Sequence, residues 1–182
     1  MGVLFLHKKK YGKMTVNAWL TMEMERSNPF VMIAFGVFLT VVALLVRGWT
    51  GSPYGVLLAL DIRDLIPPVW IMTLLWSLSF FTIGSAGGFV LAYRACGAEA
   101  EKYKGCMFFV LLAVMELLWY PAFFGAQLVF LSVLLAILCL CLSIAVTLSF
   151  YRVTKFAGMI LFLHDVWLIY MLILNFAILF RG

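Results

Sequence analysis

Ionisable side chains occur inside two long apolar runs of the sequence, where a charge is costly. Glu116 lies in the run 105–124, and the neighbours His164 and Asp165 lie in the run 156–180. A carboxylate at the centre of a bilayer costs ~2.5–3.5 kcal/mol on insertion scales, so it usually faces a cavity or a partner. We expect Glu116 to share a hydrogen-bonded or proton-sharing cluster with His164 and Asp165. The cluster is either a structural lock between two helices or a functional group that binds a cationic or metal-bearing ligand or relays protons.

The histidine has a second interpretation, because imidazole is a ligand that suits haem iron. His164 is a candidate axial ligand of haem, although the sequence offers no second ligand for it; otherwise it is a hydrogen-bonding residue. The sequence shows no Ser/His/Asp set, phosphate-binding glycine loop or metal-ligand spacing. Whether the protein is an enzyme stays open. We interpret the four cysteines as small apolar residues.

Aromatic side chains share helical faces with these ionisable groups. At about 100° per residue, the residues that lie on one face are His164, Trp167, Met171 and Asn175 in the run 156–180, and Glu116, Trp119 and Phe123 in the run 105–124. We expect both faces to converge with Thr73, Trp76 and Phe80 of an earlier run and to line a pocket. The alternative is that these side chains only pack helix against helix.

These side chains need helices to position them, and the composition indicates helices that span a membrane. Apolar residues make up 66% of the 182 residues and charged residues 12%, with a mean hydropathy of +1.13. A soluble domain is closer to half apolar and a quarter charged. The runs that approach the ~20 apolar residues of a spanning helix are 30–47, 66–93, 105–124, 127–150 and 156–180. We therefore expect an all-α, multi-pass integral membrane protein, with a five-helix bundle at 29–182 after a basic N-terminal extension at 1–28.

The basic residues are divided unevenly between the two sides that five spans would create. The ten that fall on one side are Lys8, Lys9, Lys10, Lys13, Arg26, Arg94, Lys102, Lys104, Arg152 and Lys155, and the three on the other are Arg47, Arg63 and Arg181. Basic residues are enriched on the cytoplasmic side of membrane proteins. We therefore expect the N-terminus inside and the C-terminus outside. The same division explains the net charge of +5 without a nucleic-acid partner and leaves the lipid bilayer as the expected surroundings.

Small residues cluster in the run 66–93, at Gly84, Ser85, Gly87 and Gly88. Such residues let helix backbones approach each other closely. They favour packing between helices of one chain, and a seam between two copies in a homodimer is the alternative.

Tryptophan and proline motifs follow one another along the chain. They are Pro67-Pro68-Val69-Trp70 with Trp76 after it, then Trp119-Tyr120-Pro121-Ala122-Phe123-Phe124-Gly125, then Trp167 with Asn175 after it. In this order the set resembles the translocator protein family, also called tryptophan-rich sensory proteins or peripheral benzodiazepine receptors. The resemblance covers about residues 60–181.

That resemblance implies a five-helix bundle whose pocket opens toward the loop between the first two helices. Family members bind porphyrins, sterols and drug-like aromatic molecules, and some bacterial relatives are credited with light-dependent porphyrin breakdown. Trp76 and Trp167 match the tryptophans implicated in that chemistry, and Trp119 and Asn175 match positions that shape or line the pocket. No cofactor is expected to be required, and porphyrin or haem is a candidate ligand. The membrane would be the plasma membrane in a prokaryote or the mitochondrial outer membrane in a eukaryote.

The chain departs from the family pattern near the expected pocket. Leu65 stands where the family usually has a tryptophan before the paired prolines, and Glu116 stands where it has an asparagine. Phe162-Leu163-His164 replaces a Tyr-Pro-Tyr sequence before Trp167. These changes keep the predicted fold and leave the identity of the ligand open.

We expect a membrane receptor or binding protein that holds porphyrin-like or other flat hydrophobic ligands within the bundle; the resemblance adds porphyrin degradation or transport. The predicted ligand-binding residues are Trp76, Phe80, Glu116, Trp119, Pro121, Phe123, His164, Trp167 and Asn175. One alternative is a small proton-coupled membrane carrier that uses Glu116 and Asp165. Another is an assembly or regulatory subunit without a saturable ligand site.

Overall fold

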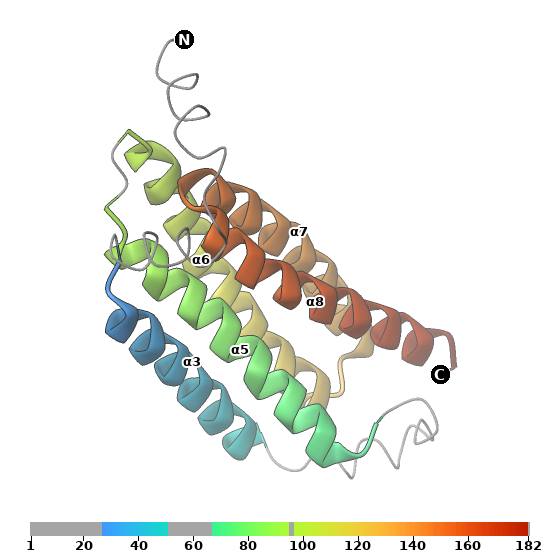
Figure 1. Ribbon diagram of the computed structural model, residues 1–182. Coiled ribbons are helices and arrows are strands. Elements are labelled where there is room, and N and C mark those ends of the chain that lie inside the picture. Colours follow the sequence, from blue (N-terminus) through green and yellow to red (C-terminus); the bar gives the residue numbers. More distant parts are fainter. Residues whose placement is uncertain (1–26, 51–66, 95–96, 182) are drawn as a thin grey trace.

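The computed structural model describes residues 27–50, 67–94 and 97–181, and most of these residues are helical. Within them, five helices are long and apolar enough to cross a membrane, which confirms the predicted architecture (Figure 1). The helices are α3 (Pro29–Thr50), α5 (Val69–Ala92), α6 (Glu99–Tyr120) with its π-helical continuation η2 (Pro121–Gly125), α7 (Val129–Val153) and α8 (Lys155–Arg181). The predicted extension at 1–28 lies almost wholly outside the described residues, and the orientation of the termini stays a prediction.

Three helix ends differ from the predicted runs. α6 begins at Glu99 rather than at residue 105, and its first turn carries acidic residues, which favour a helix N-terminus. α5 begins at Val69, after the paired prolines, because proline fits only the first turn of a helix. α3 continues past Arg47 to Thr50, and a basic residue in the last turn complements the helix dipole. The apolar runs mark the part of each helix that suits lipid, whereas the helices themselves extend further.

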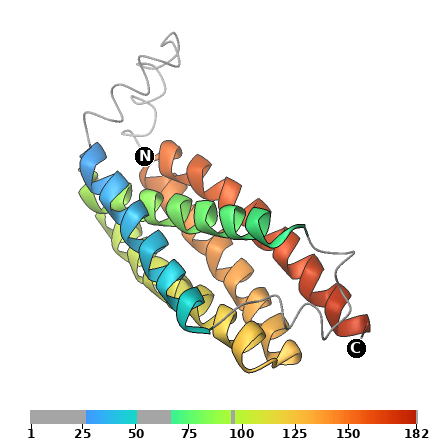
Figure 2. The same cartoon turned by 90° about the horizontal axis from the view of Figure 1, so that it is seen from below.

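α5 is the central helix of the bundle. α3 packs along one side of α5 and α8 along another, while α7 packs against both α6 and α8. α3, coloured blue to cyan, lies at the edge of the bundle in both views (Figures 1 and 2). The most hydropathic stretch of α5 is 61% buried inside the protein, against 17% for α3. α5 is therefore placed to contribute inward-facing side chains to a site, and most of α3 faces outward.

The small residues of α5 serve packing within the chain. A Cβ atom added at Gly84 would lie 2.6 Å from the Phe35 carbonyl oxygen of α3, and one at Gly88 would lie 2.7 Å from the Val31 carbonyl oxygen. A Cβ at Gly87 would lie 2.5 Å from the Phe109 ring of α6. Glycine is thus required on two sides of α5, and the expectation of close packing between helices of one chain is confirmed.

The chain leaves α6 through the π-helical turn η2. Proline lacks a backbone N–H group, so Pro121 cannot donate the hydrogen bond that would continue the α-helix. At the end of the turn the Ala126 N–H bonds to the Pro121 carbonyl at 2.9 Å, a step of five residues. Wide turns of this kind are frequent at functional sites. η2 buries Phe123 immediately before the short connection to α7, and α7 packs against α6.

Candidate functional site

A cavity lies among α3, α5, α6, η2 and α8, near the end of the bundle where α5 begins and α6 ends. Its volume is about 40 Å³. Trp76 of α5, Trp119 of α6 and Trp167 of α8 all line it. Each of these helices therefore brings one tryptophan to the same cavity, as the shared helical faces predict.

Further aromatic residues pack these tryptophans into a continuous wall. Phe123 stacks on Trp119 with ring centroids 5.4 Å apart and planes inclined by 7°. Tyr120 lies 4.9 Å from Trp76, and Phe124 lies 4.7 Å from both Tyr120 and Phe123, measured between ring centroids. Aromatic pairs at these separations add about 0.5–1.5 kcal/mol each beyond the burial of their area. The π-helical turn matters here because it carries two of these rings.

The predicted ligand-binding residues divide into two groups. Those that line the cavity are Trp76, Trp119, Phe123 and Trp167, and those that do not are Phe80, Glu116, Pro121, His164 and Asn175. Phe80 packs edge-on against Trp76, with centroids 4.9 Å apart. Asn175 is fully buried and donates to the Met171 carbonyl of its own helix at 2.7 Å. A helical face is wide enough that residues near its margin contact neighbouring helices instead of the cavity.

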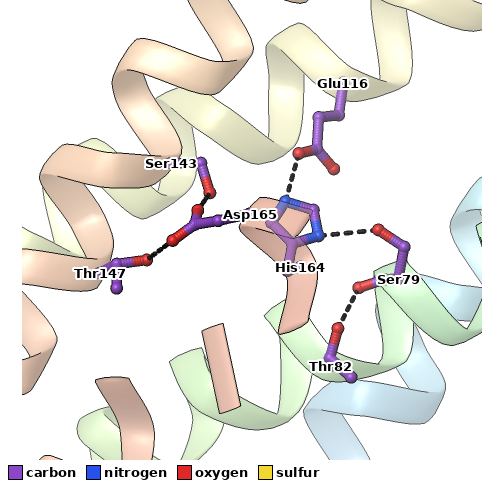
Figure 3. A network of polar contacts seen from close by, with 7 residues as sticks. All are labelled: Ser79, Thr82, Glu116, Ser143, Thr147, His164 and Asp165. Carbon is purple, nitrogen blue, oxygen red and sulfur yellow. Dashed lines mark hydrogen bonds and ion pairs between the residues drawn. The ribbon is translucent and has the colours of Figure 1, made fainter. Parts of the chain in front are cut away.

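His164 bridges two other helices. This bridge lies farther than the tryptophans from the end of the bundle where α5 begins and α6 ends. Its Nε2 lies 2.7 Å from Oε1 of Glu116 on α6, and its Nδ1 lies 2.7 Å from Oγ of Ser79 on α5 (Figure 3). The side chains of His164 and Glu116 are 0% and 7% exposed. The expected contact between Glu116 and His164 is therefore present. Ser79, which the sequence analysis did not single out, completes the bridge.

The polar bridge and the tryptophans form two successive layers. The pairs on one helix are Trp76 and Ser79 on α5, Glu116 and Trp119 on α6, and His164 and Trp167 on α8. In each pair the residues are three positions apart, about 4.5 Å along a helix. α5 runs opposite to α6 and α8, and the order of the pair reverses with it (Figure 1). All three polar side chains therefore lie on the same side of the tryptophan layer.

Asp165 does not join this bridge, and the expectation of one cluster is wrong on this point. Its carboxylate accepts hydrogen bonds from Ser143 and, at 2.9 Å, from Thr147, both on α7. Consecutive helical residues point about 100° apart. His164 consequently faces α5 and α6 while Asp165 faces α7 (Figure 3). Neither hydroxyl partner was predicted, because serine and threonine in apolar helices bond as readily to their own backbone.

Ser79, His164 and Glu116 together make a hydroxyl–imidazole–carboxylate chain, which the sequence analysis had not found. Acyl transfer by such a chain also requires hydrogen-bond donors for an oxyanion. α5 is a continuous α-helix around Ser79, so its backbone N–H groups there are already bonded within the helix. The described geometry around Ser79 therefore suits a structural lock or proton sharing, and α5 offers no free backbone donor there for an oxyanion.

The contacts of His164 do not favour metal binding. Both ring nitrogens of His164 are engaged by protein partners, so iron would have to displace one of them. Across the described ranges, no group of three or more His, Cys, Asp or Glu side chains is placed to hold a metal ion. The candidate role of His164 as an axial haem ligand is thus not favoured by its contacts.

Among the described residues, the charged side chain in the cavity wall is Arg47. The sequence analysis used Arg47 only to assign the two sides of the membrane. Arg47, in the last turn of α3, lines the cavity, and its Nε donates to the Tyr120 hydroxyl at 3.2 Å. The sequence could not place Arg47 here, because a basic residue at the end of an apolar run ordinarily reads as a membrane boundary. The cavity therefore combines an aromatic wall with a cation on one side.

Comparison with protein families supports the motif-based resemblance. The model of the TspO/MBR family matches residues 32–181. The match begins at Met32 within α3 and extends through α5, α6, η2, α7 and α8, so it includes the residues that line the cavity. The comparison with curated proteins found no match.

Proposed function

The chain belongs to the TspO/MBR family, and from this premise we propose that it is a membrane binding protein for flat hydrophobic ligands of the porphyrin type. The observation that carries the proposal is the convergence of Trp76, Trp119 and Trp167, from three different helices, on one cavity. Aromatic rings offer a planar ligand large contact areas without requiring polar groups on the ligand. A cavity between helices of a bundle is also a usual place for a small-molecule site.

The size of the cavity adds a condition to this proposal. About 40 Å³ holds one or a few water molecules, whereas sites for drug-sized ligands measure about 300–1,000 Å³. Ligand binding therefore requires side chains of the wall to move. Trp167 and Phe124 are half-buried, unlike Trp119 and Phe123, which are buried. Moving either half-buried ring therefore exposes less buried area than moving Trp119 or Phe123.

Titration of the purified full-length chain with protoporphyrin IX tests the proposal. The absorption and emission of the porphyrin are recorded for the wild type, for Trp167→Phe and for Trp70→Phe. Trp70 is 69% exposed and does not line the cavity, so it is a matched control. We expect saturable low-micromolar binding that Trp167→Phe weakens and Trp70→Phe leaves unchanged. Binding that never saturates, or that both substitutions weaken equally, would contradict a site at this cavity.

A second candidate function is a small proton-coupled carrier. It is favoured by the contact of Glu116 with His164, which lies one helical turn away from the tryptophans that line the cavity. The sequence analysis assigned this role to Glu116 and Asp165. Asp165 bonds to α7, so the pair that we consider for the carrier is Glu116 and His164. Reconstitution into liposomes separates the two functions. A carrier would move ligand in response to a pH gradient, whereas a binding protein would bind it without net flux.

A further inference from the structure

Basic side chains lie at the end of the bundle where α6 and α8 begin and α7 ends (Figure 1). Lys104, Arg152 and Lys155 come from these three helices, and all three are exposed. Each stands within two residues of the apolar run of its helix. In a bilayer such positions lie near the boundary between the hydrocarbon core and the polar headgroups. We call these three side chains the basic rim.

The helices that carry the basic rim are held together at this end. Nη1 of Arg152 on α7 lies 3.3 Å from Oε1 of Glu101 on α6. A Cβ atom added at Gly158 of α8 would lie 2.7 Å from Cβ of Tyr151 on α7, so α7 and α8 approach closely there. The basic rim is therefore one surface across α6, α7 and α8 rather than three separate charges.

The basic rim stands above apolar side chains that face outward. The exposed apolar residues about one turn deeper are Met107, Leu148 and Met159, which are 59%, 55% and 50% exposed. Met107 lies three positions from Lys104, and each of the other two lies four positions from the basic residue of its helix. Residues at these spacings share a helical face. A partner that contacts both levels needs an acidic head and an apolar tail.

Exposed tyrosines mark the same level of the bundle. Tyr103 precedes Lys104 and is 72% exposed, and Tyr151 precedes Arg152 and is 48% exposed. Tyrosine is enriched where a membrane protein meets the headgroups, because its ring is apolar and its hydroxyl is polar. This arrangement places the basic rim beside lipid headgroups and not only in water beyond the membrane.

The positive charge of the basic rim is only partly neutralised by the described residues. At this end of the bundle they carry five basic side chains and two acidic ones, Glu99 and Glu101. Glu99 accepts a hydrogen bond from a backbone N–H at 3.2 Å, and Glu101 pairs with Arg152. That pair uses one nitrogen of a guanidinium that has five N–H donors. Within the described ranges, Lys104 and Lys155 take part in no ion pair.

We propose that the basic rim binds the phosphate headgroup of an anionic phospholipid, whose acyl chains lie along the apolar residues one turn deeper. The charges are complementary, and Lys or Arg near a membrane surface attracts anionic lipid. A soluble anion would match the charges but would leave the apolar level without a partner. None of the three basic residues lines the cavity, so this lipid site is separate from the proposed ligand site.

Two lipids with identical acyl chains test the proposal. Phosphatidylglycerol carries a net negative charge, and phosphatidylcholine carries none. Each is added to the purified full-length chain in detergent, and native mass spectrometry measures the fraction of protein that holds one lipid. We expect the wild type to bind phosphatidylglycerol about tenfold or more tightly than phosphatidylcholine, since three basic side chains contribute. This preference should fall as the ionic strength rises.

Single substitutions locate the site. Lys104→Gln and Lys155→Gln should each lower the preference for phosphatidylglycerol about fivefold. Arg152→Gln should act in the same direction, and Glu101→Gln is its matched control because it breaks the same ion pair but keeps the arginine. Glu101→Gln should leave the preference unchanged or raise it. Arg181→Gln, at the opposite end of α8, should leave it unchanged.

The outcomes that contradict the proposal are distinct from one another. Equal binding of the two lipids by the wild type overturns it. A preference that the three rim substitutions leave intact, or that Arg181→Gln lowers as much, also overturns it. Glycerol phosphate is added as a soluble competitor at the concentration of the lipid, and displacement of phosphatidylglycerol by it would show a site for any anion instead of a lipid site. If Arg152→Gln does not fold, the two lysine variants still decide.

Discussion

His164 Nε2 lies 2.7 Å from Glu116 Oε1 and joins α8 to α6, two helices that otherwise make few direct contacts. The other nitrogen of the same imidazole reaches Ser79 on α5. One buried side chain on α8 therefore contacts both α5 and α6, one helical turn away from the tryptophan layer. The position of those tryptophans depends on how these three helices are held, so the bridge supports the cavity without lining it.

Replacing the histidine should destabilise the protein strongly. His164→Phe leaves the Glu116 carboxylate and the Ser79 hydroxyl buried without their partner. A buried polar group left without its hydrogen-bond partner typically costs about 1–3 kcal/mol, and more if the group is charged. We expect a marked drop in the midpoint of thermal unfolding, measured by circular dichroism in detergent. Leu163→Phe is the control, since Leu163 is the adjacent residue and is 65% exposed.

Replacing both His164 and Glu116 should destabilise the protein less than replacing His164 alone. In the double variant His164→Phe/Glu116→Leu, no carboxylate remains to be buried without a partner. We expect its unfolding midpoint to lie above that of His164→Phe. A single variant as stable as the wild type, or a double variant whose loss equals the sum of two independent losses, would show that the bridge is not formed.

Glu116→Gln distinguishes a structural lock from a proton-handling group. The amide oxygen of glutamine can still accept a hydrogen bond from the imidazole, and Glu116 does not line the cavity. As a lock, the bridge should tolerate this change with a loss of about 1 kcal/mol or less, and porphyrin affinity should stay the same. Thermal unfolding and porphyrin titration at several pH values measure both quantities. Loss of a pH dependence of binding in a stably folded variant would instead support the carrier.

The membrane fold could be predicted because its signals are local and additive. Each of the five helices carries a long apolar run, and the small residues of α5 mark where its backbone approaches another helix. Helix ends were less predictable. Charged residues such as Glu99 interrupt the apolar run but extend the helix beyond it. Hydropathy reports the environment of a residue, whereas hydrogen bonding decides where the helix stops.

The site was predictable only where one helix face determined it. Trp119 and Phe123 share a face and both line the cavity. The role of Arg47 depends on how α3 packs against the end of α6, and Ser79 depends on the distance between α5 and α8. Such contacts between helices leave no spacing pattern in the sequence. Asp165 shows the same limit, because its neighbour His164 turns toward different helices.

The interface of α3 with α5 should be sensitive to a single methyl group. A Cβ at Gly84 would lie 2.6 Å from the Phe35 carbonyl oxygen and 2.9 Å from Gly36 Cα, and backbone atoms cannot move aside as a side chain can. Gly84→Ala should therefore lower the free energy of unfolding by about 1–3 kcal/mol. Gly48→Ala is the matched control, because a Cβ there meets nothing within 4 Å. Equal stability of the two variants would mean that the helices are not this close.

Shortening Phe124 should make the cavity easier to reach. The Phe124 ring lines the cavity, is half-buried and lies against Tyr120 and Phe123 at 4.7 Å between centroids. A cavity of about 40 Å³ must open before a porphyrin fits, and Phe124→Ala removes one ring that keeps it closed. The association rate of protoporphyrin IX in stopped-flow mixing should rise in proportion to the increase in the open population. Phe130→Ala is the control, because Phe130 is 66% exposed on α7. An unchanged rate for Phe124→Ala, or an equal rise in both variants, would show that the ligand reaches the cavity past other side chains.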